Sequence, residues 1–426
     1  MKFLFATFAA YFYFMTKKII QIFSTIGCCI FIFMLNAHAQ ILTNEDSLSS
    51  GLLARDKATI ISGYGEAQYS YDVQRRNSEA TLKRVVLFVG HKFNNKISLF
   101  TELEVEDALV VGNEESNGEI AMEQAFLKFN LKNPANYIVA GLFIPRLGFI
   151  NENHLPSTFN GVDRPFVEQF VIPSTWREIG VGYFGTIQKI PGLNYSIALT
   201  NGLNSAGFRN GSGIRDGRQL GSKTQGTSLG LSASVLYYIN NFRLQASGYI
   251  GGTTALEKRV ADSLLLNSGP FGNPADLFEM NAQYSYKGWN IRALASYVGI
   301  PQASAINRAY AHNIPNSLYG GYAEVGYNLL YNKFHDDKEL IAFGRFEYMN
   351  LSATLPANGV QNDANNQKYI VAGFTFKPIK GVAVKADYVQ RMTGELNKAL
   401  IITPFPQQVP YFKNNGFINL GVAYNF

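Results

Sequence analysis

The sequence predicts an all-β fold, a transmembrane antiparallel β-barrel of about 16 strands. Segments of about ten residues alternate between apolar and polar side chains, and this length crosses the hydrocarbon core at a tilt near 45°. The links between them alternate between short and long, which is typical of barrels with short periplasmic turns and long extracellular loops. The chain of 426 residues is 47% hydrophobic but only 16% charged, and its mean hydropathy is −0.03. This composition argues against both disorder and a bundle of membrane helices.

The carboxyl-terminal segment, residues 416–426, shows the alternation most clearly. One face carries Ile418, Leu420, Val422, Tyr424 and Phe426, whereas mostly small and polar residues fill the other. Side chains of a strand point alternately to its two faces, so this strand is apolar outside and polar inside. An aromatic carboxyl terminus resembles that of bacterial outer-membrane barrels, and Tyr424 and Phe426 are therefore the predicted assembly signal.

The amino terminus predicts a secretory signal peptide over residues 1–39. Lys17 and Lys18 precede an apolar run that ends near Leu35, and Ala37-His38-Ala39 fits signal-peptidase cleavage. An uncleaved anchor helix and a lipoprotein are the alternatives. The charged segment that begins at Met15 predicts that translation starts there.

Residues 40–58 are polar and are predicted to form a periplasmic leader, and residues 59–426 are predicted to form the barrel. Both cysteines, Cys28 and Cys29, lie in the signal, so no disulfide is expected in the mature chain. Loss of the signal also lowers the excess of basic over acidic residues from six to three. This near balance predicts no nucleic-acid partner, and no cofactor is implied.

The expected strands follow in order along the chain. They cover residues 61–71, 84–93, 97–106, 124–130, 137–144, 179–186, 193–200, 229–239, 242–247, 278–286, 289–297, 319–328, 340–348, 369–376, 382–390 and 416–426. Tight turns such as Asn240-Asn241 and Lys287-Gly288 separate some pairs. A soluble β-sandwich would also alternate, but Tyr286 and Trp289 at a turn suit an interfacial aromatic girdle.

Two stretches around the longest loop resemble the phosphate-selective porin O/P family. They are residues 140–148 (AGLFIPRLG) and 172–182 (IPSTWREIGVG), with Arg164 between them. The resemblance implies a sixteen-stranded pore in the outer membrane of a Gram-negative bacterium, assembled as a homotrimer.

Alternation also predicts which charged side chains face the lumen. The cations are Arg84, Lys128, Arg243, Arg292, Arg345 and Lys385, and the anions are Glu66, Glu102, Glu104, Glu106, Glu279, Glu324, Glu347 and Asp387. This mixed lining leaves the choice between anions and cations open.

Glu102, Glu104 and Glu106 lie on one strand face about 7 Å apart and repel one another unless countered. They are predicted to form a charged pore wall. The alternatives are an ion-pair network with Arg84 and Lys128 or a calcium site, although no metal site is assigned.

The loop over residues 145–177 is predicted to fold inward as the constriction of the pore, because long structureless loops usually have a function. Arg146, His154, Arg164 and Arg177 are its candidate constriction residues. The alternative is a surface loop that contacts lipopolysaccharide.

These patterns predict a porin that passes small hydrophilic solutes or ions, with a preference for anions or phosphate implied by the resemblance. Outer-membrane lipid, lipopolysaccharide and the barrel assembly machinery are the expected partners. No enzyme is expected, since His91, His154, His312 and His335 lie on separate elements without a catalytic spacing. A barrel that serves as an adhesin or scaffold without an open pore remains the alternative.

Overall fold

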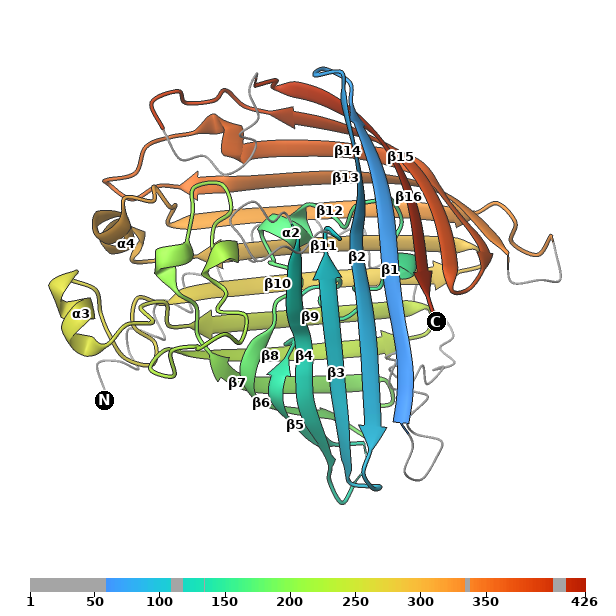
Figure 1. Ribbon diagram of the computed structural model, residues 1–426, viewed down its shortest axis with the longest axis horizontal. Coiled ribbons are helices and arrows are strands. Elements are labelled where there is room, and N and C mark those ends of the chain that lie inside the picture. Colours follow the sequence, from blue (N-terminus) through green and yellow to red (C-terminus); the bar gives the residue numbers. More distant parts are fainter. Residues whose placement is uncertain (1–58, 109–117, 134, 334–337, 401–410) are drawn as a thin grey trace. The chain divides into compact units, whose positions relative to one another are not determined.

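The structure is a computed structural model, and it describes residues 59–108, 118–133, 135–333, 338–400 and 411–426. The expected signal peptide, the leader and His335 lie outside these residues. The described chain forms one closed barrel of sixteen antiparallel strands (Figure 1). The prediction of an all-β antiparallel barrel is therefore confirmed.

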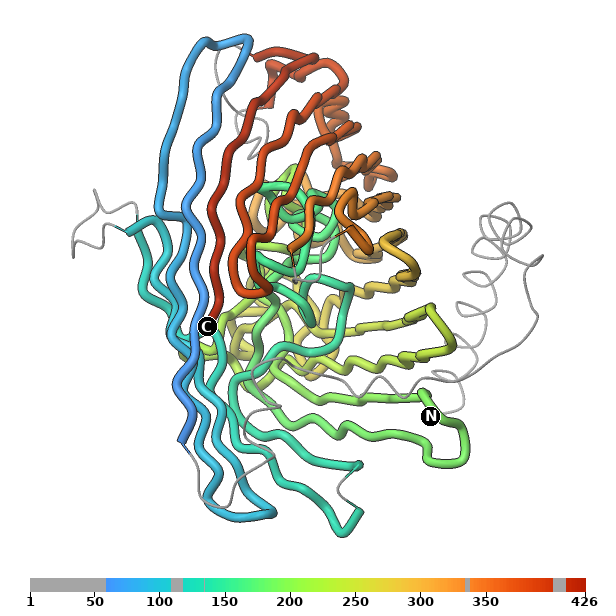
Figure 2. Tube along the Cα trace, turned by 90° about the vertical axis from the view of Figure 1, so that its right-hand side faces the viewer, coloured from blue at the N-terminus to red at the C-terminus, as the bar shows by residue number. Residues whose placement is uncertain are grey.

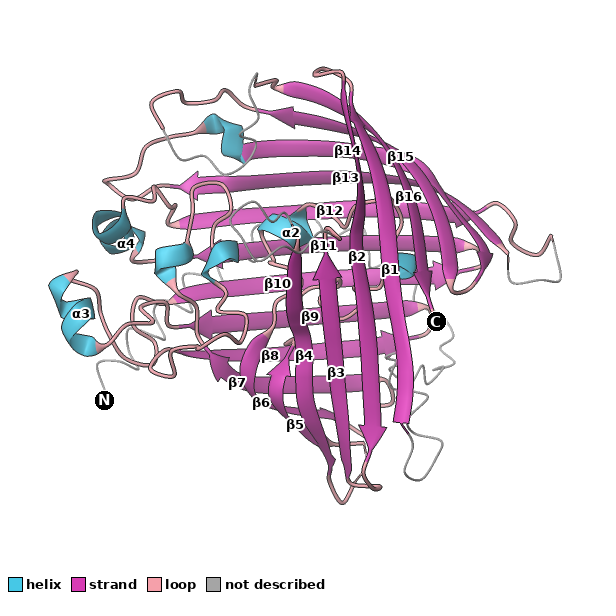
Figure 3. Cartoon of the chain, in the orientation of Figure 1, coloured by secondary structure: helices cyan, strands magenta, loops and turns pink. Residues whose placement is uncertain are grey.

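The strands run consecutively around the barrel, and helices are few and short (Figure 3). The strands are β1 (Thr59–Asp72), β2 (Asn77–Lys92), β3 (Ile97–Glu106), β4 (Glu119–Asn130), β5 (Tyr137–Phe143), β6 (Glu178–Thr186), β7 (Leu193–Asn201), β8 (Leu229–Ile239), β9 (Phe242–Gly251), β10 (Ala275–Tyr286), β11 (Trp289–Gly299), β12 (Ser317–Asn328), β13 (Glu339–Thr354), β14 (Asn366–Ile379), β15 (Val382–Thr393) and β16 (Asn414–Asn425). The α-helices among the described residues are α2 (Val167–Phe170), α3 (Lys258–Ser263) and α4 (Ala303–Tyr310).

The first and last strands close the barrel. Tyr64 of β1 is paired with Asn425, and Tyr71 is paired with Ile418. Figure 2 shows β1 in blue lying between β2 and the red β16. Each backbone group in these strands therefore has a neighbour on both sides, as a chain in hydrocarbon requires.

The two ends of the barrel differ in their connections. Strands meet at one end through short turns such as residues 240–241 and 287–288, and at the other through long loops such as 202–228 and 252–274. The expected strands over residues 61–71 and 84–93 left residues 72–83 as a connection. That interpretation is wrong, because β1 and β2 extend through most of it to a turn at residues 73–76. We call the two ends the short-turn end and the long-loop end.

The outer face is apolar and carries aromatic side chains near both ends. Tyr286, Trp289, Tyr424 and Phe426 are exposed near the short-turn end, and Tyr69, Tyr297, Tyr319 and Tyr388 are exposed toward the long-loop end. Exposed aliphatic residues such as Leu420 and Val422 lie between these positions. Two aromatic girdles around an aliphatic band are typical of a barrel embedded in a bilayer. Within the described residues, no helix is long and apolar enough to cross a membrane.

Part of the interior is a packed apolar core. Val167 and Val171 of the α2 region pack with Leu318 of β12, Met349 of β13 and Val371 of β14, all of which are buried. The barrel is therefore filled by protein on this side. The lumen is therefore not lined by polar side chains alone here, because the loop buries its apolar side chains against the wall.

Candidate functional site

The loop between β5 and β6, residues 144–177, lies inside the barrel. Figure 1 shows its short helix α2 within the ring of strands, whereas α3 and α4 lie at the strand ends. Trp176 near the end of the loop is 0% exposed, donates its indole N–H to Glu178 Oε1 at 2.9 Å and packs on the Tyr249 ring. The end of the loop around Trp176 is therefore packed against the barrel wall.

One edge of this loop is hydrogen-bonded to the strands from β11 to β16, and we call it the anchored edge. Backbone N–H groups of the loop donate to strand carboxylates, from Val162 to Asp387 Oδ2 (2.6 Å) and from Val167 to Glu347 Oε2 (2.9 Å). Strand side chains donate to loop carbonyls in return, as Arg292 does to Thr158 (2.8 Å). Most of these groups are buried, so the hydrogen bonds also satisfy charged groups removed from water.

Glycines allow two sharp bends in the loop. Gly148 has a φ of +77°, and a Cβ there would lie 2.9 Å from Glu168 Oε2, which accepts the N–H groups of Phe149 and Ile150. Gly161 has a φ of +79°, and its Cβ would lie 3.2 Å from Asp387 Oδ2. Glycine suits both positions, because it adopts a left-handed backbone conformation without strain and has no Cβ to clash with the nearby carboxylate.

The other edge of the loop faces β1 to β5, and we call it the chamber edge. On this wall Arg84 forms ion pairs with Glu66 (2.8 Å), Glu104 (2.9 Å) and Glu106 (3.4 Å). From the loop, Arg177 approaches Glu104 at 3.9 Å. The predicted glutamate wall therefore lies inside the barrel, and Arg84 is its main cationic partner.

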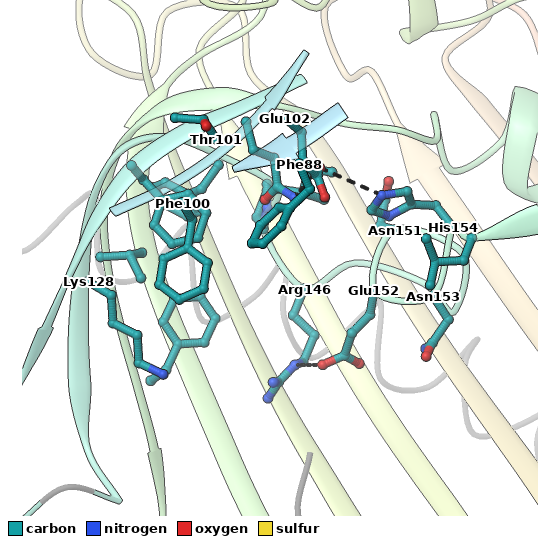
Figure 4. Close-up of a pocket in the computed structure, with 18 of the residues that line it drawn as sticks. Phe88, Phe100, Thr101, Glu102, Lys128, Arg146, Asn151, Glu152, Asn153 and His154 are labelled. Carbon is teal, nitrogen blue, oxygen red and sulfur yellow. Dashed lines mark hydrogen bonds and ion pairs between the residues drawn. The ribbon is translucent and has the colours of Figure 1, made fainter. Parts of the chain in front are cut away.

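The loop and the wall meet at a seam formed by Glu102, Glu123 and His154. His154 Nε2 lies 3.8 Å from Glu102 Oε2, and the two side chains face each other in Figure 4. Glu123 Oε2 accepts a hydrogen bond of 3.0 Å from the hydroxyl of Tyr64.

A β-bulge places Glu123 at the seam. The register between β3 and β4 shifts between the pairs Glu102↔Gln124 and Leu103↔Met122, which leaves Glu123 unpaired between them. Glu123 is 0% exposed, and its neighbour Gln124 donates to Glu102 Oε2 at 2.7 Å. Glu123 and Gln124 are neighbours in the sequence, yet both side chains face the inside of the barrel. Strict alternation does not allow this, but a β-bulge does.

A cavity of about 310 Å³ lies on the long-loop side of the seam, and we call it the long-loop chamber. Its cationic side chains include Arg164, Arg215 and Arg218, which donate to the backbone carbonyls of His154, Gln169 and Thr175 respectively. Within the described ranges, none of these three has a carboxylate within 4.0 Å. Burial, followed by the like charges of Arg215 and Arg177, lowers the pKa of Arg218 to about 10.

A second cavity of about 280 Å³, the short-turn chamber, lies on the other side of the seam. Stacked rings line part of it, Phe100 on Phe126 with centroids 5.2 Å apart and Tyr137 on Phe184 at 5.3 Å. Lys128 Nζ lies 4.0 Å from the centre of the Tyr137 ring. This chamber is aromatic, whereas the long-loop chamber is highly charged.

Arg146 and Glu152 face each other at the short-turn chamber (Figure 4) and form an ion pair of 2.7 Å. Glu152 also contacts Arg243 of β9. Burial opposes ionisation of Glu152, but Arg146 and Arg243 together hold the pKa of its carboxyl below the usual range. Glu152 thus connects Arg146 of the loop to Arg243 of β9 on the facing wall.

The predicted site residues fall into five groups. Arg84, Glu104, Glu106 and Arg177 form one charged network, Glu102 and His154 meet at the seam, and Arg164 lies beside them with its pKa lowered by burial and by Arg84. Lys128 and Arg146 line the short-turn chamber. Arg345 lies on the opposite wall, 1% exposed at its side chain, between Glu324 and Glu347. Tyr424 and Phe426 lie on the outer face.

No protein-family model matches this sequence. An uncharacterised protein of Aquifex aeolicus is 29% identical over 347 residues, which are 78% of this chain and 76% of that protein. OmpF of Salmonella typhi, solved in complex with daunomycin, has a TM-score of 0.53 at 13% identity over 87% of this chain and 98% of that chain. The outer membrane channel DcaP of Acinetobacter baumannii has a TM-score of 0.51 at 14% identity over the same shares of the two chains. The chain has a porin-like barrel fold. The finer resemblance to the phosphate-selective porin O/P family stays a prediction.

Proposed function

We propose that this protein is a porin of a Gram-negative outer membrane that lets small hydrophilic solutes or ions diffuse through its barrel. The observation that carries the proposal is the position of the two chambers. Both lie along the wall from β1 to β5, on opposite sides of the seam, inside a closed barrel. The packed core blocks the other side, so the path runs between the chamber edge and this wall.

We further propose that the long-loop chamber favours anions. Arg164, Arg215 and Arg218 bring three positive charges whose hydrogen bonds go to carbonyl groups, whereas Arg84 is paired with three carboxylates on the wall. The chamber as a whole is lined by six basic and six acidic residues, so the proposed preference rests on where the charges lie. Three guanidinium groups on the loop side raise the local concentration of anions there. A phosphate preference would use the same groups, since guanidinium groups bind phosphate oxygens through paired N–H donors.

The proposal keeps the constriction role of the loop, a homotrimeric assembly, and Tyr424 and Phe426 as the assembly signal read by the barrel assembly machinery. The exposed girdles support contact with lipid and lipopolysaccharide. Catalysis is not part of the proposal. His91 lies at the end of β2 beside Thr59, His154 lies at the seam, and His312 lies beside Arg209, so these three do not gather in one site.

Planar-bilayer recording of the purified protein tests the proposal. We expect stepwise conductance in symmetric KCl and a reversal potential that reports an excess of chloride permeability under a KCl gradient. A variant lacking residues 151–160 should conduct more, because it removes His154 and the Asn160 anchor but keeps α2 and Trp176, which hold the apolar core. Heat-modifiable electrophoretic mobility would show that this variant still folds.

Folded wild-type protein without conductance would contradict the porin and favour an adhesin or scaffold. Equal conductance of the folded deletion variant would remove the loop from its role as the constriction.

A further inference from the structure

The seam of Glu102, Glu123 and His154 has the composition and spacing of a metal site. One potential ligand atom from each residue lies within 4.8 Å of the other two, and His154 Nε2 is 3.8 Å from Glu102 Oε2. Bond lengths of about 2.0–2.2 Å to zinc place neighbouring ligands about 3.3–4 Å apart. The seam therefore requires only a small rotation of one carboxylate to close around an ion.

Unsatisfied polar atoms at the seam provide a second, independent observation. His154 is 7% exposed, and neither of its ring nitrogens has a hydrogen-bond partner among the described residues. Glu123 is 0% exposed, and its Oε1 also lacks a partner in that part of the chain. A neutral imidazole carries a lone pair on one ring nitrogen, so His154 and Glu123 each leave a buried lone pair without a partner. Buried polar atoms are nearly always bonded, so these two side chains indicate a missing partner that accepts lone pairs.

The surroundings hold both carboxylates in place. Tyr64, 0% exposed, donates its hydroxyl to Glu123 Oε2, and Gln124 donates its amide to Glu102 Oε2. Protein metal centres generally fix their ligands through such outer hydrogen bonds. The β-bulge that turns Glu123 inward is the backbone feature that adds the second carboxylate to the seam.

We propose that Glu102, Glu123 and His154 bind a divalent transition-metal ion of the zinc type, which joins the loop to the wall. An imidazole nitrogen with two carboxylates is a ligand set for such ions, whereas calcium and magnesium prefer oxygen ligands only. Glu104 and Glu106 take no part, because Arg84 occupies them. The calcium alternative based on those three glutamates is thereby replaced by a different ligand set.

A bound ion would have two effects on the barrel. It would tie His154 of the loop to β3 and β4, which are otherwise linked to the loop mainly through the long contact of Arg177 with Glu104. It would also neutralise two carboxylates on the proposed diffusion path and so ease the passage of anions. The binding itself does not depend on the proposed porin function and is measured without a bilayer.

Zinc titration of the full mature chain, folded in detergent and first treated with a chelator, tests the site. We expect one zinc per chain by calorimetry and elemental analysis. His154→Ala and Glu123→Gln should each weaken binding at least about a hundredfold, and Tyr64→Phe should weaken it about 10–100-fold because it removes an outer hydrogen bond. His91→Ala is the matched control, since His91 lies at the short-turn end beside Thr59, and it should bind as the wild type does.

Heat-modifiable mobility identifies the variants that fold, and Glu102→Gln provides a third ligand variant should either of the others not fold. The proposal is overturned if the wild type binds no zinc in the micromolar range. It is equally overturned if the folded ligand variants bind zinc as tightly as His91→Ala.

Discussion

The two edges of the inward loop contact the barrel in different ways. The anchored edge is held by buried hydrogen bonds and ion pairs to β11–β16 and by the apolar core around Val167 and Val171. The chamber edge leaves two cavities and meets the wall through the packing of Leu155 on Tyr64 and Val86. Its charged contacts with the wall are long, 3.8 Å for His154 and 3.9 Å for Arg177. The difference separates stability from transport, because changes at the first edge should release the loop and changes at the second should alter which ions pass.

The largest effect is expected from Arg345→Ala at the anchored edge. Arg345 contacts Glu324 and Glu347 at 3.1 and 2.8 Å and donates to the carbonyls of Asn160 and Asp163 in the loop. Its removal leaves two buried carboxylates without their cation, which costs about 3–5 kcal/mol of unfolding free energy. The temperature at which heat-modifiable mobility is lost should fall, and conductance should rise as the loop detaches.

Lys377→Ala is the matched control for that variant. Lys377 pairs with Glu339 at 3.1 Å, but the Glu339 side chain is 41% exposed, so the change should stay below about 1 kcal/mol. Equal losses of stability in the two variants would mean that the anchored edge is not held by its buried charges.

How far the sequence predicts this site depends on whether alternation holds. It holds along β3 and β16, so the inward positions of Glu102 and Glu104 and the outward positions of Leu420 and Val422 followed from parity alone. It fails at Glu123, because the β-bulge between β3 and β4 adds one residue to β4, and a single sequence does not show which residue a bulge adds. A carboxylate next to Gln124 at the edge of an expected strand was the only available signal.

The apolar core inside the barrel was missed for a different reason. Leu318, Met349 and Val371 face inward, and only contact with Val167 and Val171 of a distant loop explains why apolar side chains occupy those positions. Such long-range packing overrides the rule that a lumen is polar. The loop itself was predicted from its length, but the edge by which it is anchored was not.

Smaller effects are expected from single charges at the chamber edge, and they should act on selectivity. Arg164→Ala removes a guanidinium that has no carboxylate within 4.0 Å in the described chain, so permeability should shift toward cations. Glu104→Gln removes one of the carboxylates that pair with Arg84, so permeability should shift toward anions. A unit charge about 4 Å from an ion is worth about 1 kcal/mol in water, which is about a fivefold change in permeability ratio.

Reversal potentials under a KCl gradient measure these shifts. Arg308→Ala is the control, because it removes the same charge from an exposed position on α4, where salt screens it. Shifts of one sign in both chamber-edge variants, or a shift of equal size in Arg308→Ala, would contradict a path along this edge.

The smallest expected effect is a pH dependence that differs between the edges. Burial, followed by the carboxylate of Asp387, raises the pKa of Asp163 in the long-loop chamber to about 6. Burial also raises the pKa of Glu168 to about 7; this residue lies in α2 of the loop and accepts a hydrogen bond from the hydroxyl of Tyr322. Both carboxyl groups are neutral at low pH and gain a negative charge as the pH rises through these values.

The charge of Asp163 should lower the preference for anions between pH 5 and pH 7, because it faces the proposed path. The charge of Glu168 should instead lower stability. Its pKa is higher in the folded than in the unfolded chain, so its stabilising contribution is complete below about pH 4.5 and is lost as the pH rises through about 7. Because folding raises the pKa of Asp163 as well, its charge also lowers stability as the pH rises through about 6. Asp163→Asn should therefore remove the pH dependence of the reversal potential and weaken that of thermal stability, whereas Glu168→Gln should weaken the pH dependence of thermal stability and leave that of the reversal potential. If each variant changed both quantities alike, the two edges of the loop would not act independently, because a single coupled network would then carry both stability and selectivity.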